Sequence, residues 1–259
     1  MLELHQVEVV YNKTATAIRG VSMEAAAGKI TALLGTNGAG KTTTLTAISG
    51  FLGMESAEVI GGEIRFDGRR IDRMPTHRIS RLGIALVPER DKVFDTLTVA
   101  DNVKLVSAGS AGVHTIFEEF PRLKELSART AGYLSGGEKQ LLALAMALAT
   151  EPKVLLVDEL SLGLAPLVAH GLLTELQRVQ RSRGLTVLLV EQNAAAALEV
   201  ADYGYVMEDG RIVHDGTPEA LLSHGDIMEF YLGTASGGAE GQRSYRDVKQ
   251  YRRKRRWAG

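Results

Sequence analysis

The stretch Gly35-Thr-Asn-Gly-Ala-Gly-Lys41-Thr42 decides the fold of this chain. It matches the pattern Gly-x-x-x-x-Gly-Lys-Ser/Thr, and it follows a short apolar run from Ile30 to Leu34. That run has the length and composition of a parallel strand buried on both faces. After the loop, Thr42 to Ile48 predicts a helix that ends at Gly50. A strand, a glycine-rich loop and a helix in this order predict a phosphate-binding loop.

The glycine-rich loop has the chemistry that a phosphate group requires. Glycines allow successive backbone N–H groups to point at one anion, and the helix start adds unpaired donors and partial positive charge. We expect Lys41 to reach the β- and γ-phosphates and the Thr42 hydroxyl to contact Mg²⁺. An ordinary glycine-rich turn is the alternative. The candidate ATP-binding residues in this stretch are Gly35, Thr36, Asn37, Gly38, Ala39, Gly40, Lys41, Thr42 and Thr43.

A second apolar strand, Val154-Leu-Leu-Val157, is followed directly by two carboxylates, Asp158 and Glu159. At the carboxyl end of a parallel strand, Asp158 is placed to hold a metal ion, usually through water. Glu159 is then placed to orient or deprotonate an attacking water, which makes it the candidate catalytic residue. A buried strand that meets a solvated acidic turn is the alternative.

A third motif, Leu134-Ser-Gly-Gly-Glu-Lys-Gln140, opens a helix in which Ser135 is a suitable N-cap. Two glycines just inside a helix cost roughly 1 kcal/mol each relative to alanine, so a purely structural explanation is strained. Close approach of backbone N–H groups to an anion explains them. Because the first loop already accounts for one nucleotide, we expect this phosphate to belong to the nucleotide of a second subunit.

Taken in order, these motifs resemble the ATP-hydrolysing subunit of an ABC transporter. The resemblance rests on the glycine-rich loop, Leu134 to Gln140, Val157-Asp-Glu159 and Ser161-Leu-Gly-Leu164, and it covers about residues 2–233. It implies an α/β fold with a P-loop NTPase (RecA-like) core, an antiparallel β lobe and a helical lobe. It also implies a head-to-tail dimer with two ATP molecules held between one subunit's phosphate loop and the other subunit's signature helix.

The resemblance also implies roles for individual residues. Tyr11 would stack on adenine, although a tyrosine on a strand face is the alternative. The loop from Ser161 to Leu164 would cross the dimer interface. The signature residues that would face the partner's nucleotide are Ser135, Gly136, Gly137 and Glu138.

The expected domain organisation follows the same resemblance. Residues 1–233 would form the ABC ATPase domain, with the antiparallel lobe mainly in 1–30 and 58–72. The helical lobe would occupy about 90–149 and contact the permease, and the rest would form the core. A hairpin with an Asp67-Gly68 turn is expected in the antiparallel lobe. Residues 234–259 would form a flexible joint and a basic tail.

Finer similarity points to the ATPases of branched-chain amino-acid importers of the LivF type. It rests on strings that include Leu86-Val-Pro-Glu89, Leu97-Thr-Val99 and Leu189-Val-Glu-Gln-Asn193. Such ATPases work with a second ATPase subunit, two membrane permeases and, indirectly, a solute-binding protein. The sequence leaves open whether the second ATPase subunit is another copy of this chain or a different chain.

The chain departs from the general ABC pattern at three positions. Glu89 replaces the usual glutamine, and as a hard oxygen ligand it remains a candidate for Mg²⁺ together with Thr42 and Asp158. Gln192 replaces the usual histidine and is the second candidate catalytic residue; its amide can hydrogen-bond a γ-phosphate but does not titrate near neutral pH. The importer branch has both replacements. Leu160 replaces a proline, from which we expect a slightly looser turn.

Composition agrees with a protein that reaches the membrane through partners. The chain has no cysteine, a net charge of −1 and no apolar stretch of spanning length. Its start lacks the features of a signal peptide. We therefore expect a location on the cytoplasmic face of the inner membrane. The segment 243–256 carries eight basic residues and one acid, Asp247. It is expected to dock on an acidic surface, extend into solvent or contact anionic lipid, and nucleic acid is the least favoured partner.

The predicted function is ATP hydrolysis that drives import of branched-chain or other hydrophobic amino acids. The alternatives are a soluble ABC-type ATPase that acts on nucleic acid or ribosomes, and the ATPase of an ABC exporter. The soluble relatives usually carry two cassettes or a long coiled coil, and this chain shows neither.

Overall fold

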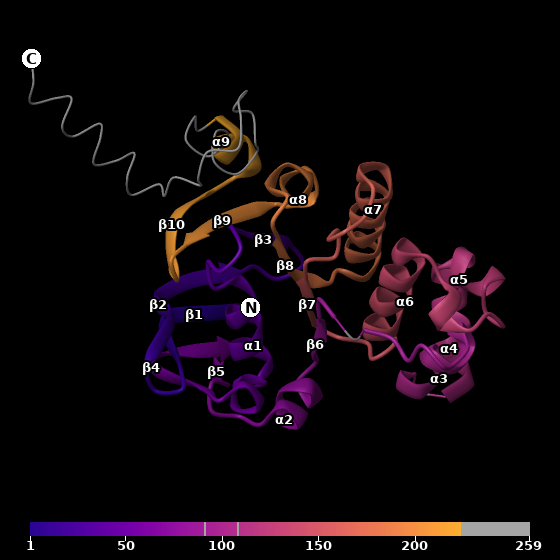
Figure 1. Cartoon of the computed structure of the whole chain (residues 1–259), viewed down its shortest axis with the longest axis horizontal. Coiled ribbons are helices and arrows are strands. Elements are labelled where there is room, and N and C mark those ends of the chain that lie inside the picture. The colour runs from indigo at the N-terminus through magenta and orange to yellow at the C-terminus, as the bar shows by residue number, and fades with distance from the viewer. Residues whose placement is uncertain (91, 108, 224–259) are drawn as a thin grey trace, which may run out of the picture.

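Two β-sheets organise the structure, and helices lie between and beside them (Figure 1). The computed structural model describes residues 1–90, 92–107 and 109–223, so the predicted joint and basic tail lie outside the described residues. The strands are β1 (Leu2–Tyr11), β2 (Ala15–Ala25), β3 (Ile30–Leu34), β4 (Ala57–Phe66), β5 (Arg69–Arg70), β6 (Ile84–Val87), β7 (Val154–Asp158), β8 (Thr186–Glu191), β9 (Tyr203–Glu208) and β10 (Arg211–Gly216).

The helices of the described part fall into two groups along the chain, those before β7 and those after it. Those before β7 are α1 (Lys41–Ser49), η1 (Leu52–Glu55), α2 (Thr76–Arg81), α3 (Val99–Val106), α4 (Gly109–Glu119), α5 (Pro121–Glu125), η2 (Ala131–Tyr133) and α6 (Gly136–Leu148). Those after it are α7 (Pro166–Arg183), α8 (Ala194–Val200) and α9 (Pro218–Ser223). The expected helix after the glycine-rich loop is confirmed, and it begins one residue earlier than predicted.

The central sheet has the order β10-β9-β3-β8-β7-β6, and all its strands except β10 run parallel. Every residue of β3, β7 and β8 is buried, as expected for apolar parallel strands covered on both faces. Leu34 pairs with Glu191, and Asp158 pairs with Val190. The carboxyl ends of these three strands therefore meet at one edge of the sheet, where α/β proteins bind ligands.

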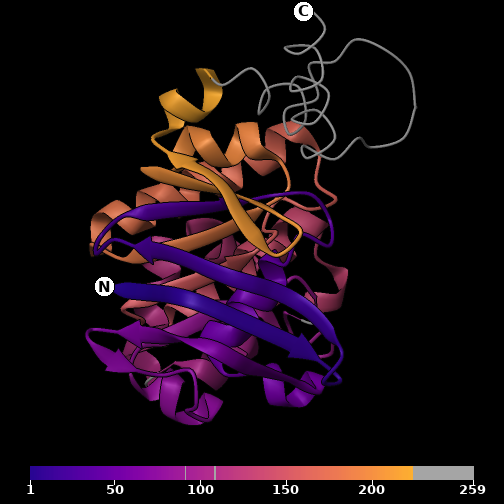
Figure 2. The same cartoon turned by 90° about the vertical axis from the view of Figure 1, so that its left-hand side faces the viewer.

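The second sheet is antiparallel, with the order β2-β1-β4-β5. Figure 2 shows its long strands crossing the side of the molecule opposite the helical region. The predicted turn between β4 and β5 is confirmed: Asp67 and Gly68 have φ angles of 48° and 76°, as a tight two-residue hairpin requires.

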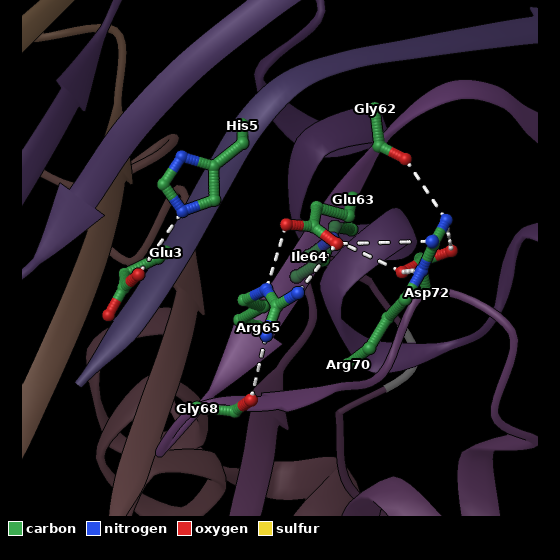
Figure 3. A network of polar contacts seen from close by, with 9 residues as sticks. All are labelled: Glu3, His5, Gly62, Glu63, Ile64, Arg65, Gly68, Arg70 and Asp72. Carbon is green, nitrogen blue, oxygen red and sulfur yellow. Dashed lines mark hydrogen bonds and ion pairs between the residues drawn. The ribbon is translucent and has the colours of Figure 1, made fainter.

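Ion pairs fasten the β4–β5 end of this sheet (Figure 3). Arg65 makes two hydrogen bonds to Glu63, at 2.8 and 3.0 Å. Arg70 makes two to Asp72, at 2.8 and 3.1 Å, and the Ile64 N–H donates to the same carboxylate at 3.2 Å. Burial alone raises the pKa of Asp72, but these hydrogen bonds outweigh it and hold the pKa below its ordinary value.

Two hydrophobic clusters form the core, one on each face of the central sheet. The first packs the antiparallel sheet and α1 against residues such as Leu33, Leu156 and Leu188. The second packs α6, α7 and α8 against the opposite face, through Leu34, Leu189 and neighbouring residues. The alternation of adjacent strand residues between the two clusters follows the period of a β-strand.

The helices α3 to α6 form a group beside the central sheet (Figure 1). Lys92 donates from its Nζ to Gln140 Oε1 at 2.5 Å, which ties the segment after β6 to α6. Arg183 at the end of α7 pairs with Glu119 at the end of α4, and it also donates to the Leu148 carbonyl at 2.9 Å. Within the described residues, no helix is both long and apolar enough to cross a membrane.

Candidate nucleotide-binding site

The glycine-rich loop joins β3 to α1 at the edge where the parallel strands end. Gly40 has a φ of 107°, which an L side chain rarely adopts, and it is the N-cap of α1. No side chain caps this helix start, so its first N–H groups face the loop without a side-chain acceptor. This is the arrangement in which a helix start binds phosphate.

Lys41 is buried and makes three polar contacts with its Nζ. It donates to the carbonyls of Gly35 at 2.9 Å and Thr36 at 3.2 Å, and it lies 3.4 Å from Glu159 Oε1. Both side chains of the ion pair are less than a tenth exposed. The structure therefore brings the predicted phosphate-binding lysine and the predicted catalytic carboxylate together.

Thr42 and Asp158, predicted as metal ligands, also meet. Thr42 Oγ1 donates to Asp158 Oδ1 at 3.3 Å, although the two residues lie 116 positions apart. Burial raises the pKa of Asp158 to about 6, and the nearby carboxylates of Glu159 and Glu89 add to the rise, while the Thr42 hydroxyl opposes it. A cation bound beside Asp158 would offset this cost of burying a negative charge.

The backbone turns sharply directly after Asp158. Glu159 has a φ of 47°, uncommon for a residue other than glycine, and its N–H donates to the Val190 carbonyl at 2.9 Å. The side chain of Leu160 is completely buried in the second hydrophobic cluster. The leucine thus anchors the turn in the core, and the looser turn expected at Leu160 stays a prediction.

A cleft of about 430 Å³ opens over the glycine-rich loop. It is of the size that holds small ligands. Its lining residues are Ala17, Asn37, Gly38, Gly40, Lys41, Thr42, Thr43, Glu89, Arg90, Glu159 and Leu162. Glu89 therefore shares one cleft with Thr42 and Glu159. The Nε atom of Arg90 lies 3.1 Å from the Glu89 carboxylate.

The remaining predicted residues lie around this cleft. Tyr11 is half-buried, and its hydroxyl lies 3.3 Å from Thr43 Oγ1 and donates to Glu55 at 2.8 Å. Burial is the largest cause that raises its pKa. Gln192 is exposed and follows β8 directly, at the same sheet edge as Asp158.

The signature residues lie at the start of α6 and do not line this cleft. Ser135 and Glu138 form a reciprocal capping box, which confirms Ser135 as the N-cap. The Glu138 carboxylate also accepts from Arg122 at 2.9 Å. Ser135, Gly137 and Glu138 line a separate groove of about 430 Å³ together with Phe120, Leu141 and Val168.

Gly137 has a packing reason to be glycine that sequence reasoning missed. A Cβ atom added to it would lie 2.6 Å from Val168 Cγ1 on α7. Packing against the exposed Val168 side chain is therefore a structural reason for Gly137, beside the expected approach of a phosphate.

Sequence reasoning also missed a role for Glu191 and its contact with Ser161. Glu191 ends β8, is 2% exposed, and accepts from the Ser161 N–H at 2.9 Å and the Ser161 hydroxyl at 2.7 Å. The signal was present, because Glu191 is an acidic residue at the carboxyl end of a buried strand, like Asp158. Among the described residues, no group of three or more His, Cys, Asp or Glu side chains is placed to hold a metal ion.

Comparison with known proteins agrees with this geometry. The sequence profile of the family described as ABC transporter matches residues 18–161. The high-affinity branched-chain amino acid transport ATP-binding protein BraG of Pseudomonas aeruginosa is 41% identical over 239 residues, which is 90% of this chain and 100% of BraG. The chain belongs to the ABC transporter family.

This ABC ATPase is also similar to other members. It is 37% identical to a probable branched-chain amino acid transport ATP-binding protein LivF of Archaeoglobus fulgidus, over 79% of this chain and 87% of that protein. It is 31% identical to the lipopolysaccharide export system ATP-binding protein LptB of Haemophilus influenzae, over 85% of this chain and 92% of LptB. Among solved structures, the ADP conformation of an ATP-binding cassette from an ABC transporter has a TM-score of 0.79 and 26% identity, and the match covers 90% of this chain and 98% of that one.

The predicted fold class and ATPase activity are thereby confirmed. The ABC ATPase has the α/β architecture of these cassettes, and it binds and hydrolyses ATP. The resemblance to the ATP-binding subunits of branched-chain amino-acid transporters is confirmed as well.

Proposed function

We propose that this ABC ATPase energises an importer of branched-chain or other hydrophobic amino acids. The observation that carries the proposal is the 41% identity to BraG over the whole length of that protein. The lower identity of 31% to LptB supports export of a lipid as the second candidate. A soluble role on nucleic acid or ribosomes draws no support from the relatives described above.

In the proposed mechanism the chain's own residues bind and orient ATP. Lys41 and the N–H groups at the start of α1 hold the terminal phosphates, and Tyr11 stacks on the adenine. The side-chain NH₂ group of Gln192 donates a hydrogen bond to the γ-phosphate. Glu159 orients the attacking water and accepts its proton, for which its position in the cleft beside Lys41 is suited.

Residues that would hold Mg²⁺ are Thr42, Asp158 and Glu89. The fit rests on the contact between Thr42 Oγ1 and Asp158 Oδ1, which joins two hard oxygen donors of the kind that Mg²⁺ prefers. Mg²⁺ usually keeps several waters and takes only one or two protein carboxylates, so this small donor set suffices. When bound, the ion neutralises charge on the phosphates.

A dimer completes the proposed site. The signature residues Ser135 to Glu138 lie outside the cleft that holds the glycine-rich loop, and no second copy of that loop exists in the sequence. We infer that they contact the nucleotide of a second ATPase subunit, so that two subunits enclose two nucleotides. Closure of this dimer on ATP and its release after hydrolysis would drive the permeases.

The proposed contact with a permease lies where the core meets the helical group. A groove of about 280 Å³ runs there, lined by apolar side chains that include Phe51, Leu86, Val106 and Met146. Its occupant would be an apolar segment of a permease, and a solute-binding protein would act on the far side of the membrane. The chain itself would then be peripheral, on the cytoplasmic face.

Two experiments test the proposal. Affinity purification of the full chain from its own cells, followed by mass spectrometry, should recover two hydrophobic permeases and a solute-binding protein for amino acids. Recovery of lipopolysaccharide-export or ribosomal proteins instead would overturn the proposal. In the isolated complex, Glu159→Gln should bind ATP and stop hydrolysis. A wild-type rate in this variant would remove Glu159 as the catalytic base.

A further inference from the structure

A buried carboxylate that has no place in the mechanism above contacts the loop after Glu159. Glu191 Oε1 accepts from the backbone N–H of Ser161 at 2.9 Å, and Oε2 accepts from the Ser161 hydroxyl at 2.7 Å. Glu191 ends β8, the strand that pairs with both β3 and β7. The contact therefore joins the strand that precedes Gln192 to the segment that carries Glu159.

The segment 159–161 needs to be held, because its backbone is strained. Glu159 adopts a left-handed φ of 47°, which is unfavourable for a residue other than glycine. Such a conformation persists where the surrounding structure over-determines it. Here the Val190 carbonyl holds the N–H of Glu159 at 2.9 Å, Leu160 is buried, and Glu191 holds Ser161.

Stability alone does not explain a carboxylate at this position. An ionised carboxylate loses its solvation when it is taken out of water, and a well-packed apolar residue of similar volume is often at least as stable there. Burial raises the pKa of Glu191, and the Ser161 hydrogen bonds only partly oppose the rise. The benefit of a carboxylate at this position is that its two oxygens match the two donors of Ser161, the N–H and the hydroxyl.

We propose that Glu191 is a positioning residue for ATP hydrolysis. By fixing Ser161, it holds the turn that aims the Glu159 carboxylate at the attacking water. The inference rests on the proposed role of Glu159. It assigns no contact with ATP to Glu191, so its loss should lower kcat and leave the affinity for ATP nearly unchanged.

The decisive test compares two substitutions of Glu191 in the full-length chain. Glu191→Leu removes both acceptors, and we expect kcat to fall about tenfold or more while KM for ATP changes less than about threefold. Glu191→Gln keeps both contacts, because its amide oxygen accepts from the Ser161 N–H and its NH₂ group donates to the Ser161 hydroxyl. It should retain most of kcat. The exposed Glu199, which pairs with His170, gives the matched control Glu199→Leu, with unchanged kcat.

Several outcomes would overturn the inference. It fails if Glu191→Leu hydrolyses ATP at the wild-type rate, if kcat and ATP affinity fall together, or if Glu191→Gln is as impaired as Glu191→Leu. Should Glu191→Leu not fold, as judged by circular dichroism, Ser161→Ala decides. This variant removes only the 2.7 Å contact. A lower kcat with unchanged KM supports the inference, and an unchanged kcat overturns it.

Glu159→Gln, assayed in parallel, separates this inference from the proposed mechanism. If Glu159→Gln is inactive and Glu191→Leu is fully active, only the positioning role is lost. If Glu159→Gln hydrolyses ATP at the wild-type rate, the proposed role of Glu159 fails first.

Discussion

Lys41 Nζ lies 3.4 Å from Glu159 Oε1, and both side chains are buried. The pair joins the phosphate loop after β3 to the turn after β7, although the two residues are far apart in the sequence. A buried ion pair of this kind is sensitive to removal of either partner, because the remaining charge is left without compensation.

We expect Lys41→Ala to lose ATP affinity and stability together. Loss of the phosphate contact should weaken ATP binding by more than about tenfold, or ~1.4 kcal/mol. The unpaired Glu159 carboxylate should also lower the free energy of unfolding by about 3–5 kcal/mol. Calorimetric titration and urea denaturation measure the two effects. Adding Glu159→Gln to Lys41→Ala should restore part of the stability but not the affinity, and unchanged ATP affinity in Lys41→Ala would contradict the role of the lysine.

Asp158→Asn should stabilise the protein in the absence of nucleotide and metal. The folded-state pKa of about 6 lies above the unfolded value of about 3.9, so stability falls as pH rises through this window. Removing the charge should therefore raise the free energy of unfolding at pH 7.5 by about 1–3 kcal/mol. Hydrolysis should be lost.

The measurement for Asp158→Asn is denaturation in EDTA at two pH values. The gain over wild type should be present at pH 7.5 and small at pH 4. If the variant is less stable than wild type at pH 7.5, the charge on Asp158 does not destabilise the folded protein, and the prediction is wrong.

Gly137→Ala tests why glycine occurs at this position. Its Cβ would lie 2.6 Å from Val168 Cγ1, so the exposed Val168 side chain must shift, and we expect a loss of stability of about 1 kcal/mol and of most ATP hydrolysis. Adding Val168→Ala removes the colliding methyl group and should restore stability, as measured by thermal denaturation. If hydrolysis returns as well, packing is the reason for the glycine; if only stability returns, the reason is close approach of a phosphate.

Asp72→Asn should destabilise the antiparallel sheet in a pH-dependent manner. Because the folded-state pKa of Asp72 is below its ordinary value, its stabilisation is present above the unfolded pKa and is lost as pH falls through the folded pKa. At pH 7 the variant should lose about 1–3 kcal/mol, and this loss should shrink as pH falls through the folded pKa of Asp72. Glu118→Gln, at an exposed ion pair, is the control that should change little over the same pH range.

Local signals in the sequence predicted much of the fold. The α7 helix runs from Pro166 to Arg183, because proline suits its first turn and Gly184 ends it in a left-handed conformation. The Asp67-Gly68 turn and the Ser135 cap are equally local. Each of these features depends on a few neighbouring residues, so the sequence contains the whole signal.

The features that were missed depend on contacts between distant segments. Leu160 anchors the turn because the core around it comes from other helices and strands. The contact between Gly137 and Val168 follows from how closely α6 approaches α7. The Glu191–Ser161 contact requires that β8 lies beside β7. Periodicity and motif spacing carry no information about such strand order or helix distance.

The place of β8 in the central sheet has a consequence for synthesis of the protein. β3 and β7 are made first, but the strand that joins them, Thr186–Glu191, leaves the ribosome only after most of the described residues. A nascent chain that stops short of this strand contains the complete phosphate loop, Asp158 and Glu159. It lacks the strand that pairs with both β3 and β7 and so places them side by side. Bound ATP therefore cannot rescue such an unfinished chain from proteolysis, whereas it can protect one that extends past it.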